Sequence, residues 1–130
     1  MSLPDDPIAN ISRIVAKALS EIIGNSGLTA TAEDALKIIG ATIVAQESSL
    51  VGGRRWVDEV FAQLDDTVHI DWYIVDGESA EAGDVICKLV GPAQAFLLGE
   101  RSALTYLKNL SSTTDTDAKP AEFSMNLKID

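Results

Sequence analysis

Apolar residues recur every three or four positions in two early stretches of the chain, and each stretch predicts an amphipathic helix. The first helix is expected to begin at Asp6-Pro7, where a capping residue precedes a proline at the first helical position, and to end at Gly24. The second helix follows the break at Gly52-Gly53 and ends at Asp65-Asp66. The expected apolar faces are Ile8, Ile11, Val15, Ala18, Leu19 and Ile22 in the first helix, and Val57, Val60, Phe61 and Leu64 in the second.

The segments around the second helix predict strands. Residues 31–34 are able to cap a short turn, and residues 38–45 are rich enough in β-branched side chains to form a buried strand. After the second helix the period changes to two, with Val68, Ile70, Trp72 and Ile74 expected on one face and His69, Asp71 and Tyr73 on the other. Asp76-Gly77 predicts a turn, and a further strand is expected over residues 85–90, before Gly91-Pro92.

Residues 93–110 predict a third helix, which carries the adjacent charged residues Glu100 and Arg101. The residues Phe96, Leu97, Leu104 and Leu107 recur at the spacing of one helical face. We expect Glu100 in the middle of this apolar face and Arg101 at its edge. A buried carboxylate needs a partner to offset lost hydration, whereas a guanidinium at the margin is able to reach a partner chain or an anionic ligand. This helix is therefore the first candidate for a functional site.

The C-terminal residues change character twice. The sequence is polar from residue 111 to residue 117, which is typical of a linker. Phe123, Met125, Leu127 and Ile129 then alternate with polar residues, a pattern that predicts one amphipathic strand at an open sheet edge. We interpret residues 1–111 as one domain and residues 112–130 as a polar linker with an added strand, and we take that strand as a sign that the chain is complete.

Composition restricts the class of protein. The chain has 130 residues, 46% of them hydrophobic, which is enough for one domain with a core. The formal net charge of −10 repels phosphate backbones and anionic lipids, so neither nucleic acid nor a membrane surface is expected as a partner. The single Cys87 cannot form an internal disulfide bond, and neither a signal peptide nor a long apolar stretch is present. We therefore expect a cytoplasmic protein.

For the other candidate residues, a structural explanation accounts for the sequence pattern. Arg54 and Arg55 follow two glycines and offer a weak anion site, although an exposed entry to the second helix explains the same pattern. His69 is the only histidine, which excludes a site built from several histidines, and no metal site is predicted. Cys87 alternates with Val85 and Leu89, as a small buried hydrophobic residue would.

Several blocks of residues together resemble the N-terminal domain of quinolinate phosphoribosyltransferase, also called nicotinate-nucleotide pyrophosphorylase. The resemblance covers residues 8–111, and its most specific block is Leu98-Gly99-Glu100-Arg101-Ser102-Ala103-Leu104. The other blocks are Ala18-Leu19-Ser20-Glu21, Trp56-Val57-Asp58-Glu59-Val60-Phe61, Asp76-Gly77 with Gly83-Asp84, and Gly91-Pro92-Ala93. The resemblance implies an α+β fold of the hammerhead or barrel-sandwich type, in which helices pack on one side of a small, mainly antiparallel sheet. We do not expect the α/β barrel domain that follows in the family to be part of this fold.

The resemblance also implies roles for two residues. In the family, the arginine that corresponds to Arg101 reaches across a dimer interface and holds a carboxylate of quinolinate, and Glu100 stands beside it as a supporting residue. A planar guanidinium suits this planar dicarboxylate because it donates two parallel hydrogen bonds, which a lysine cannot do. The resemblance therefore implies a homodimer, with a separate barrel-containing protein as another partner. The Mg²⁺ of phosphoribosyl transfer is expected only in a complete enzyme, and no cofactor is expected here.

Two departures from the family pattern bear on function. The segment Ile22-Ile23-Gly24-Asn25-Ser26-Gly27-Leu28-Thr29 lacks both aspartates and one glycine of the family pattern. Residues Leu110-Ser111-Ser112-Thr113-Thr114-Asp115 replace the segment that leads into the barrel in the family. We expect a stand-alone, non-catalytic homologue that acts by dimerisation or by binding a partner or a small anion. The alternative is a fragment of a complete enzyme of NAD biosynthesis. A further likeness, of residues 76–86 to biotinyl or lipoyl carrier domains, lacks their exposed lysine, so no carrier function is expected.

Overall fold

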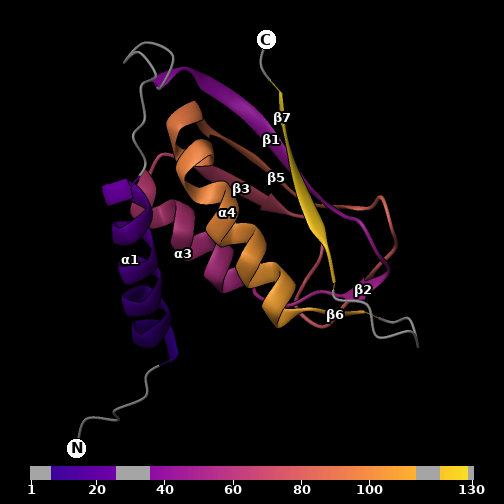
Figure 1. Ribbon diagram of the computed structural model, residues 1–130. Coiled ribbons are helices and arrows are strands. Elements are labelled where there is room, and N and C mark those ends of the chain that lie inside the picture. Colours follow the sequence, from indigo (N-terminus) through magenta and orange to yellow (C-terminus); the bar gives the residue numbers. More distant parts are fainter. Residues whose placement is uncertain (1–6, 26–35, 114–120, 129–130) are drawn as a thin grey trace, which may run out of the picture.

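A computed structural model describes residues 7–25, 36–113 and 121–128 of the chain. Its helices are α1 (Pro7–Asn25), α3 (Arg54–Leu64) and α4 (Ala93–Leu110). The strands, drawn in Figure 1, are β1 (Ile38–Ala45), β2 (Ser49–Leu50), β3 (His69–Trp72), β4 (Ser79–Ala80), β5 (Val85–Pro92), β6 (Ser112–Thr113) and β7 (Phe123–Lys128). The fold is α+β, as expected, and the described residues form no closed barrel.

The main sheet has four antiparallel strands in the order β3-β5-β1-β7. In the register of its centre, Ile43 of β1 lies between Cys87 of β5 and Met125 of β7. Strands β1 and β7, which are far apart in the sequence, are therefore neighbours, and β7 forms one edge of the sheet (Figure 1). A second, smaller sheet has the order β4-β2-β6.

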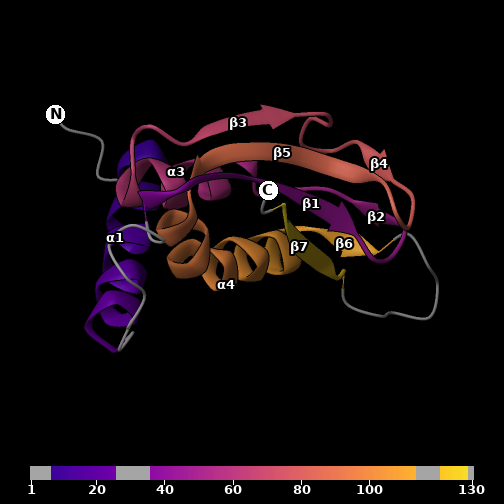
Figure 2. The same cartoon turned by 90° about the horizontal axis from the view of Figure 1, so that it is seen from above.

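The helices lie on one face of the main sheet (Figure 2). Alternate residues of β1 are buried beneath them, whereas the residues between these are exposed or half-buried. The buried side chains of the sheet and of the helices form one core because each of these elements is apolar on one face only. Its members include Ile39, Ala41 and Ile43 of β1, Cys87 and Leu89 of β5, Val57, Val60 and Phe61 of α3, and Phe96, Ala103 and Leu107 of α4.

The predicted helices agree with the observed ones to within one or two residues. Gly53 precedes α3 with a φ of 96°, a conformation that favours glycine, and Asp65 ends the helix with its backbone N–H bonded to the carbonyl of Phe61. The carboxylate of Asp65 also accepts hydrogen bonds from the backbone N–H and the hydroxyl of Thr67. These two bonds lower the pKa of Asp65. The turn expected at residues 31–34 lies outside the described residues.

The predicted strands are also present. From Val68 to Ile74 the even-numbered residues are buried or half-buried and the odd-numbered ones are exposed, as the period of two indicated, although hydrogen bonding makes a strand of only His69–Trp72. Strand β5 continues two residues further than expected, to Pro92. The C-terminal alternation forms β7, which pairs with β1. In the polar run before it, Ser112 and Thr113 form the short strand β6, which the sequence did not reveal.

No helix in the described part of the chain is both long enough and apolar enough to cross a membrane.

Candidate functional site

One side of helix α4 is buried in the core and is called its closed side, whereas the other side is exposed or half-buried and is called its open side. The residues on each side differ from those that the sequence predicted. The fully or nearly fully buried residues are Ala95, Phe96, Leu98, Gly99, Ser102, Ala103 and Leu107. Leu97, however, is 51% exposed, and Leu104 is only half-buried. The prediction that Glu100 lies in the middle of the buried face is therefore wrong, since Glu100 is half-buried at the boundary and Arg101 is exposed.

The physical reason is that small residues let α4 approach α3. A Cβ atom at Gly99 would lie 2.7 Å from Leu64 Cδ1 and 2.8 Å from Phe61 Cε1, closer than such atoms can approach. The ring of Phe61 packs edge to face on Phe96, with the ring centres 5.7 Å apart. Glycine at position 99 thus lets α4 approach α3 closely, whereas Leu97 is exposed and Leu104 is half-buried at the edge of the core.

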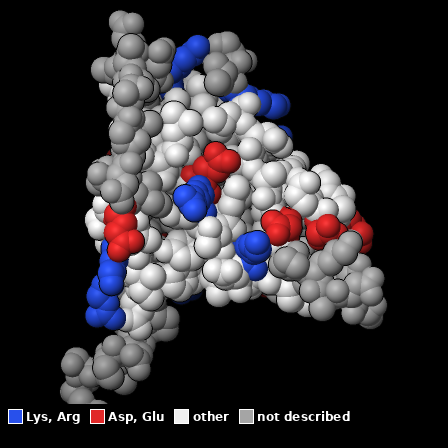
Figure 3. Space-filling model, in the orientation of Figure 1, with Lys and Arg blue, Asp and Glu red and all other residues white. Residues whose placement is uncertain are grey.

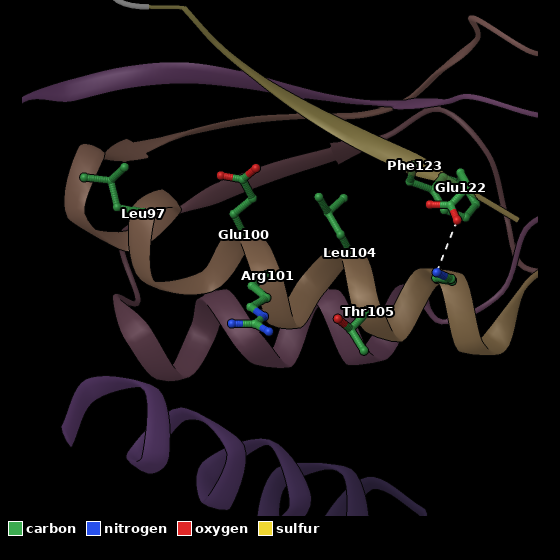
Figure 4. A pocket seen from close by; sticks show the side chains of 8 residues that line it. Leu97, Glu100, Arg101, Leu104, Thr105, Glu122 and Phe123 are labelled. Carbon is green, nitrogen blue, oxygen red and sulfur yellow. Dashed lines mark ion pairs between the residues drawn. The ribbon is translucent and has the colours of Figure 1, made fainter. Parts of the chain in front are cut away.

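The open side of α4 borders a cavity of about 390 Å³. The cavity lies between α4 and the start of β7, and its lining residues are Leu97, Glu100, Arg101, Leu104, Thr105, Lys108, Glu122 and Phe123 (Figure 4). Figure 3 shows that the surface over α4 is mostly uncharged, with basic and acidic groups lying side by side in it. A cavity that combines apolar and charged side chains in this way is a candidate binding site.

The charged groups of this cavity differ in their partners. Lys108 Nζ lies 3.2 Å from Glu122 Oε1, so this pair is neutralised within the chain. Glu100 and Arg101 make no hydrogen bond and no ion pair with any other described residue. They also diverge, with Glu100 on the side of α4 toward the sheet and Arg101 on the side toward α1 (Figure 4). The guanidinium of Arg101 therefore has its donors available for a carboxylate or phosphate from outside.

Arg54 and Arg55 lie elsewhere, at the start of α3, and line a separate cavity of about 310 Å³ with Asp58 and Asp76. The guanidinium of Arg54 lies 5.2 Å from the ring centre of Trp72, and the Trp72 Nε1–H donates to Asp58 Oδ1 over 2.7 Å. Removal of the carboxyl from water raises the pKa of Asp58, against the opposing effects of the Trp72 hydrogen bond and of Arg54. Two carboxylates beside two guanidiniums balance the local charge, which weakens the attraction of this place for an anion.

The remaining candidate residues, His69 and Cys87, are explained by their places in the fold. His69 is exposed, with Nε2 3.0 Å from Asp71 Oδ1. Cys87 is fully buried, and this burial raises the pKa of its thiol to about 12. In the described ranges, no three His, Cys, Asp or Glu residues lie where they could hold a metal ion together.

Sequence reasoning missed the contribution of Lys108, Glu122 and Phe123 to the α4 cavity. The alternation around Phe123 predicted a strand but gave no indication that its first residues would face α4. That arrangement depends on the pairing of β7 with β1, which brings residues far apart in the sequence together.

Comparisons with known proteins now place this geometry in a family. Residues 21–111 match the family described as quinolinate phosphoribosyl transferase, N-terminal domain. A quinolinate phosphoribosyltransferase [decarboxylating] of Nicotiana glauca is 29% identical over 110 residues, which are 83% of this chain and 31% of that protein. A probable nicotinate-nucleotide pyrophosphorylase of Bacillus subtilis is 35% identical over 91 residues, 70% of this chain and 32% of that protein.

A solved structure is also similar. The nicotinate-nucleotide pyrophosphorylase from Francisella tularensis superimposes with a TM-score of 0.68 at 26% identity, over 82% of this chain and 37% of that one. The chain thus spans about a third of the length of the curated relatives that it matches.

Proposed function

Because the chain belongs to the family of the quinolinate phosphoribosyltransferase N-terminal domain, we propose that it is a binding domain that acts through the open side of α4. In this proposal it contacts another protein chain there, and Arg101 donates hydrogen bonds to a carboxylate at the contact. The observation that carries the proposal is the exposed Arg101, which has no partner among the described residues and lines the cavity between α4 and β7. An unpaired guanidinium at a partly apolar surface is able to form charge-assisted hydrogen bonds with a carboxylate that a second surface supplies.

The chemistry of Arg101 favours a planar carboxylate as its ligand. Quinolinate carries two carboxylates on one aromatic ring, and a guanidinium is able to bind one of them through two parallel hydrogen bonds. The half-buried Leu104 and the exposed Leu97 offer apolar surface close to the same guanidinium. The side chain of Glu100 points away from that of Arg101 (Figure 4). Within one chain, its carboxylate therefore does not pair with the guanidinium of Arg101.

We further propose that the domain does not catalyse phosphoribosyl transfer by itself. That reaction needs cationic groups and a metal ion to stabilise the pyrophosphate that leaves. Several acidic groups of this domain are engaged in local structure instead. Asp76 accepts from the backbone of Arg54, Glu78 from that of Val75 and Asp84 from that of Glu81.

A second candidate function is that this chain is part of a complete quinolinate phosphoribosyltransferase and supplies Arg101 to its active site. The length of the relatives favours it, since most of their residues lie outside the matched region. In this case a barrel-containing protein or domain supplies the catalytic groups, and the open side of α4 closes over its site.

Calorimetric titration with quinolinate tests the proposal. We expect the wild-type chain to bind quinolinate, alone or with a barrel-containing partner, and Arg101→Lys to weaken the binding about tenfold through loss of one of two parallel hydrogen bonds. Arg13→Lys is the matched control, because Arg13 is an exposed arginine of α1 and should leave the affinity unchanged. Equal affinity of the Arg101→Lys and wild-type chains would contradict the role of Arg101. Nicotinate mononucleotide formed by the purified chain from quinolinate, phosphoribosyl pyrophosphate and Mg²⁺ would contradict the non-catalytic assignment.

A further inference from the structure

Strand β7 is an edge of the main sheet that is open to a further strand. In the described part of the chain β7 pairs with β1 alone, so alternate residues of β7 direct their backbone N–H and C=O groups away from the sheet. Natural edge strands are commonly protected by shortness, by charged residues, by proline or by a bulge. Strand β7 has six residues, the four between Phe123 and Lys128 are uncharged and include no proline, and its register with β1 runs without a shift.

The opposite edge of the sheet differs from β7. Strand β3 has only four residues, and two of them, His69 and Asp71, are exposed and form a polar pair with Nε2 3.0 Å from Oδ1. A short strand with an exposed carboxylate is typical of a protected edge. Of the two edges of the main sheet, β7 is therefore the one that is suited to an added strand.

The cavity beside α4 lies where the side chains of such a strand would project. Phe123 and Met125 are buried, so this face of β7 is turned toward the helices. A strand added beside β7 continues the sheet and directs every second side chain to the same face, over the open side of α4. The cavity of about 390 Å³ lies there, and Leu97, Glu100 and Leu104 point from α4 toward the strands (Figure 4).

Glu100 indicates the charge of the occupant. Its side chain is half-buried, and it makes no hydrogen bond or ion pair with any other described residue. Lys108 lines the same cavity, but it is already paired with Glu122. A carboxylate that is partly removed from water is stabilised by a charge-assisted hydrogen bond from a basic side chain. The net charge of −10 also attracts a basic segment over a longer range.

From these observations we propose that an extended, basic segment of another protein adds to β7 as a fifth strand of the main sheet. Its backbone bonds to the outward N–H and C=O groups of β7, one lysine or arginine on its helix side pairs with Glu100, and apolar side chains on the same side contact Leu97 and Leu104. Strand addition of this kind gains affinity from the backbone and specificity from alternate side chains. The inference rests on the proposed function only in using the open side of α4. It leaves Arg101, which points toward α1, to a carboxylate ligand (Figure 4).

A designed peptide tests the charge of the occupant. The capped peptide Ser-Val-Thr-Arg-Thr-Val-Ser places its arginine and both valines on one face of a strand. Titration at about 50 mM salt, followed by the amide chemical shifts of the chain, should give a dissociation constant of about 100 μM. Glutamate in place of the arginine should weaken the binding at least about tenfold. Glu100→Arg should reverse this preference, whereas Glu21→Arg, the same change at an exposed position of α1, should keep it. Equal binding of the two peptides by the wild-type chain would overturn the pairing with Glu100.

Methylation of the peptide backbone tests strand addition itself. Successive residues of a strand direct their N–H groups to opposite edges. Methyl groups on the N–H groups that face β7 should therefore block the pairing, and methyl groups on the other alternate set should not. The affinities of the two methylated peptides should differ at least about tenfold. If both bind equally well, side chains alone make the contact and there is no added strand.

The place of binding and the identity of the occupant complete the test. The shifted amides should belong to β7 and α4, and shifts confined to β3, or no binding at about 1 mM peptide, would contradict the proposal. Sedimentation of the chain alone examines a second copy as the occupant. Self-association that the peptide abolishes would assign the edge to that copy and overturn the proposal. Titration with quinolinate is independent of these measurements. Loss of peptide binding alone would leave the role of Arg101 standing, and loss of quinolinate binding alone would leave the added strand.

Discussion

The two sides of α4 belong to one helix, but they differ in what restricts the residue types at their positions. On the closed side, Phe96 is fully buried and Gly99 leaves no room for a Cβ atom against Phe61 and Leu64. On the open side, Leu97 is half-exposed and Arg101 has no partner among the described residues. Packing fixes the residue types on the first side, whereas the second side is free to carry chemistry.

This difference explains why the motif Leu98-Gly99-Glu100-Arg101 joins small, apolar and charged residues within one helical turn. Gly99 brings α4 onto α3, and the next two residues are then held by a rigid element at the rim of a cavity. Binding residues on a helix are positioned more firmly than residues on a loop. The comparison predicts that a change at a buried position next to or on the closed side of α4 and the same kind of change on its open side have effects of very different size.

The largest expected contrast is in thiol reactivity. Cys87 faces the helices from β5 and its thiol has a pKa of about 12, so it should resist a disulfide reagent at pH 8 in the folded chain. A cysteine in place of Leu97 should react about a thousandfold faster, because an exposed thiol has an ordinary pKa near 8.5 and is accessible. Counting modified thiols over time checks this. Comparable rates for the wild-type chain and the Leu97→Cys variant would contradict the closed packing of the sheet under the helices.

The next contrast is in stability. Phe96→Ala should lower the free energy of unfolding by about 3–5 kcal/mol, because it removes a buried ring that packs on Phe61 and leaves a cavity. Leu97→Ala, one residue away on the open side, should change it by about 0.5 kcal/mol or less in the monomeric state. Urea unfolding followed by circular dichroism measures both variants. A large loss for Leu97→Ala in dilute monomer would mean that this leucine is packed within its own chain.

The sequence predicted the outline of the fold because most elements have clear periods and clear ends. A regular apolar face predicted α1, and strict alternation predicted the faces of residues 68–74. The error at α4 has a definite physical origin. A count of large apolar residues treats Leu97 and Leu104 as buried and ignores Gly99 and Ala103, although small residues mark the place where two helices approach most closely.

The candidate site could be predicted only in part for a related reason. Glu100 and Arg101 were singled out from their position in a motif, and the structure brings both to one cavity. The other wall of that cavity comes from Glu122 and Phe123, and their approach depends on the register between β7 and β1. A register of this kind is a long-range property that local periodicity does not encode.

The smallest expected contrast concerns the fit of α4 on α3. Gly99→Val should destabilise the fold by about 1–3 kcal/mol, because the new side chain overlaps the ring of Phe61 and the end of Leu64 and forces both to move. Thr105→Val places the same side chain on the open side of the helix, at an exposed position, and should stay within about 0.5 kcal/mol of the wild-type chain. Thermal and urea unfolding of both variants give the comparison. If Gly99→Val is as stable as Thr105→Val, then α4 is free to move away from α3, and the rigid placement of Arg101 on which its binding role depends is lost.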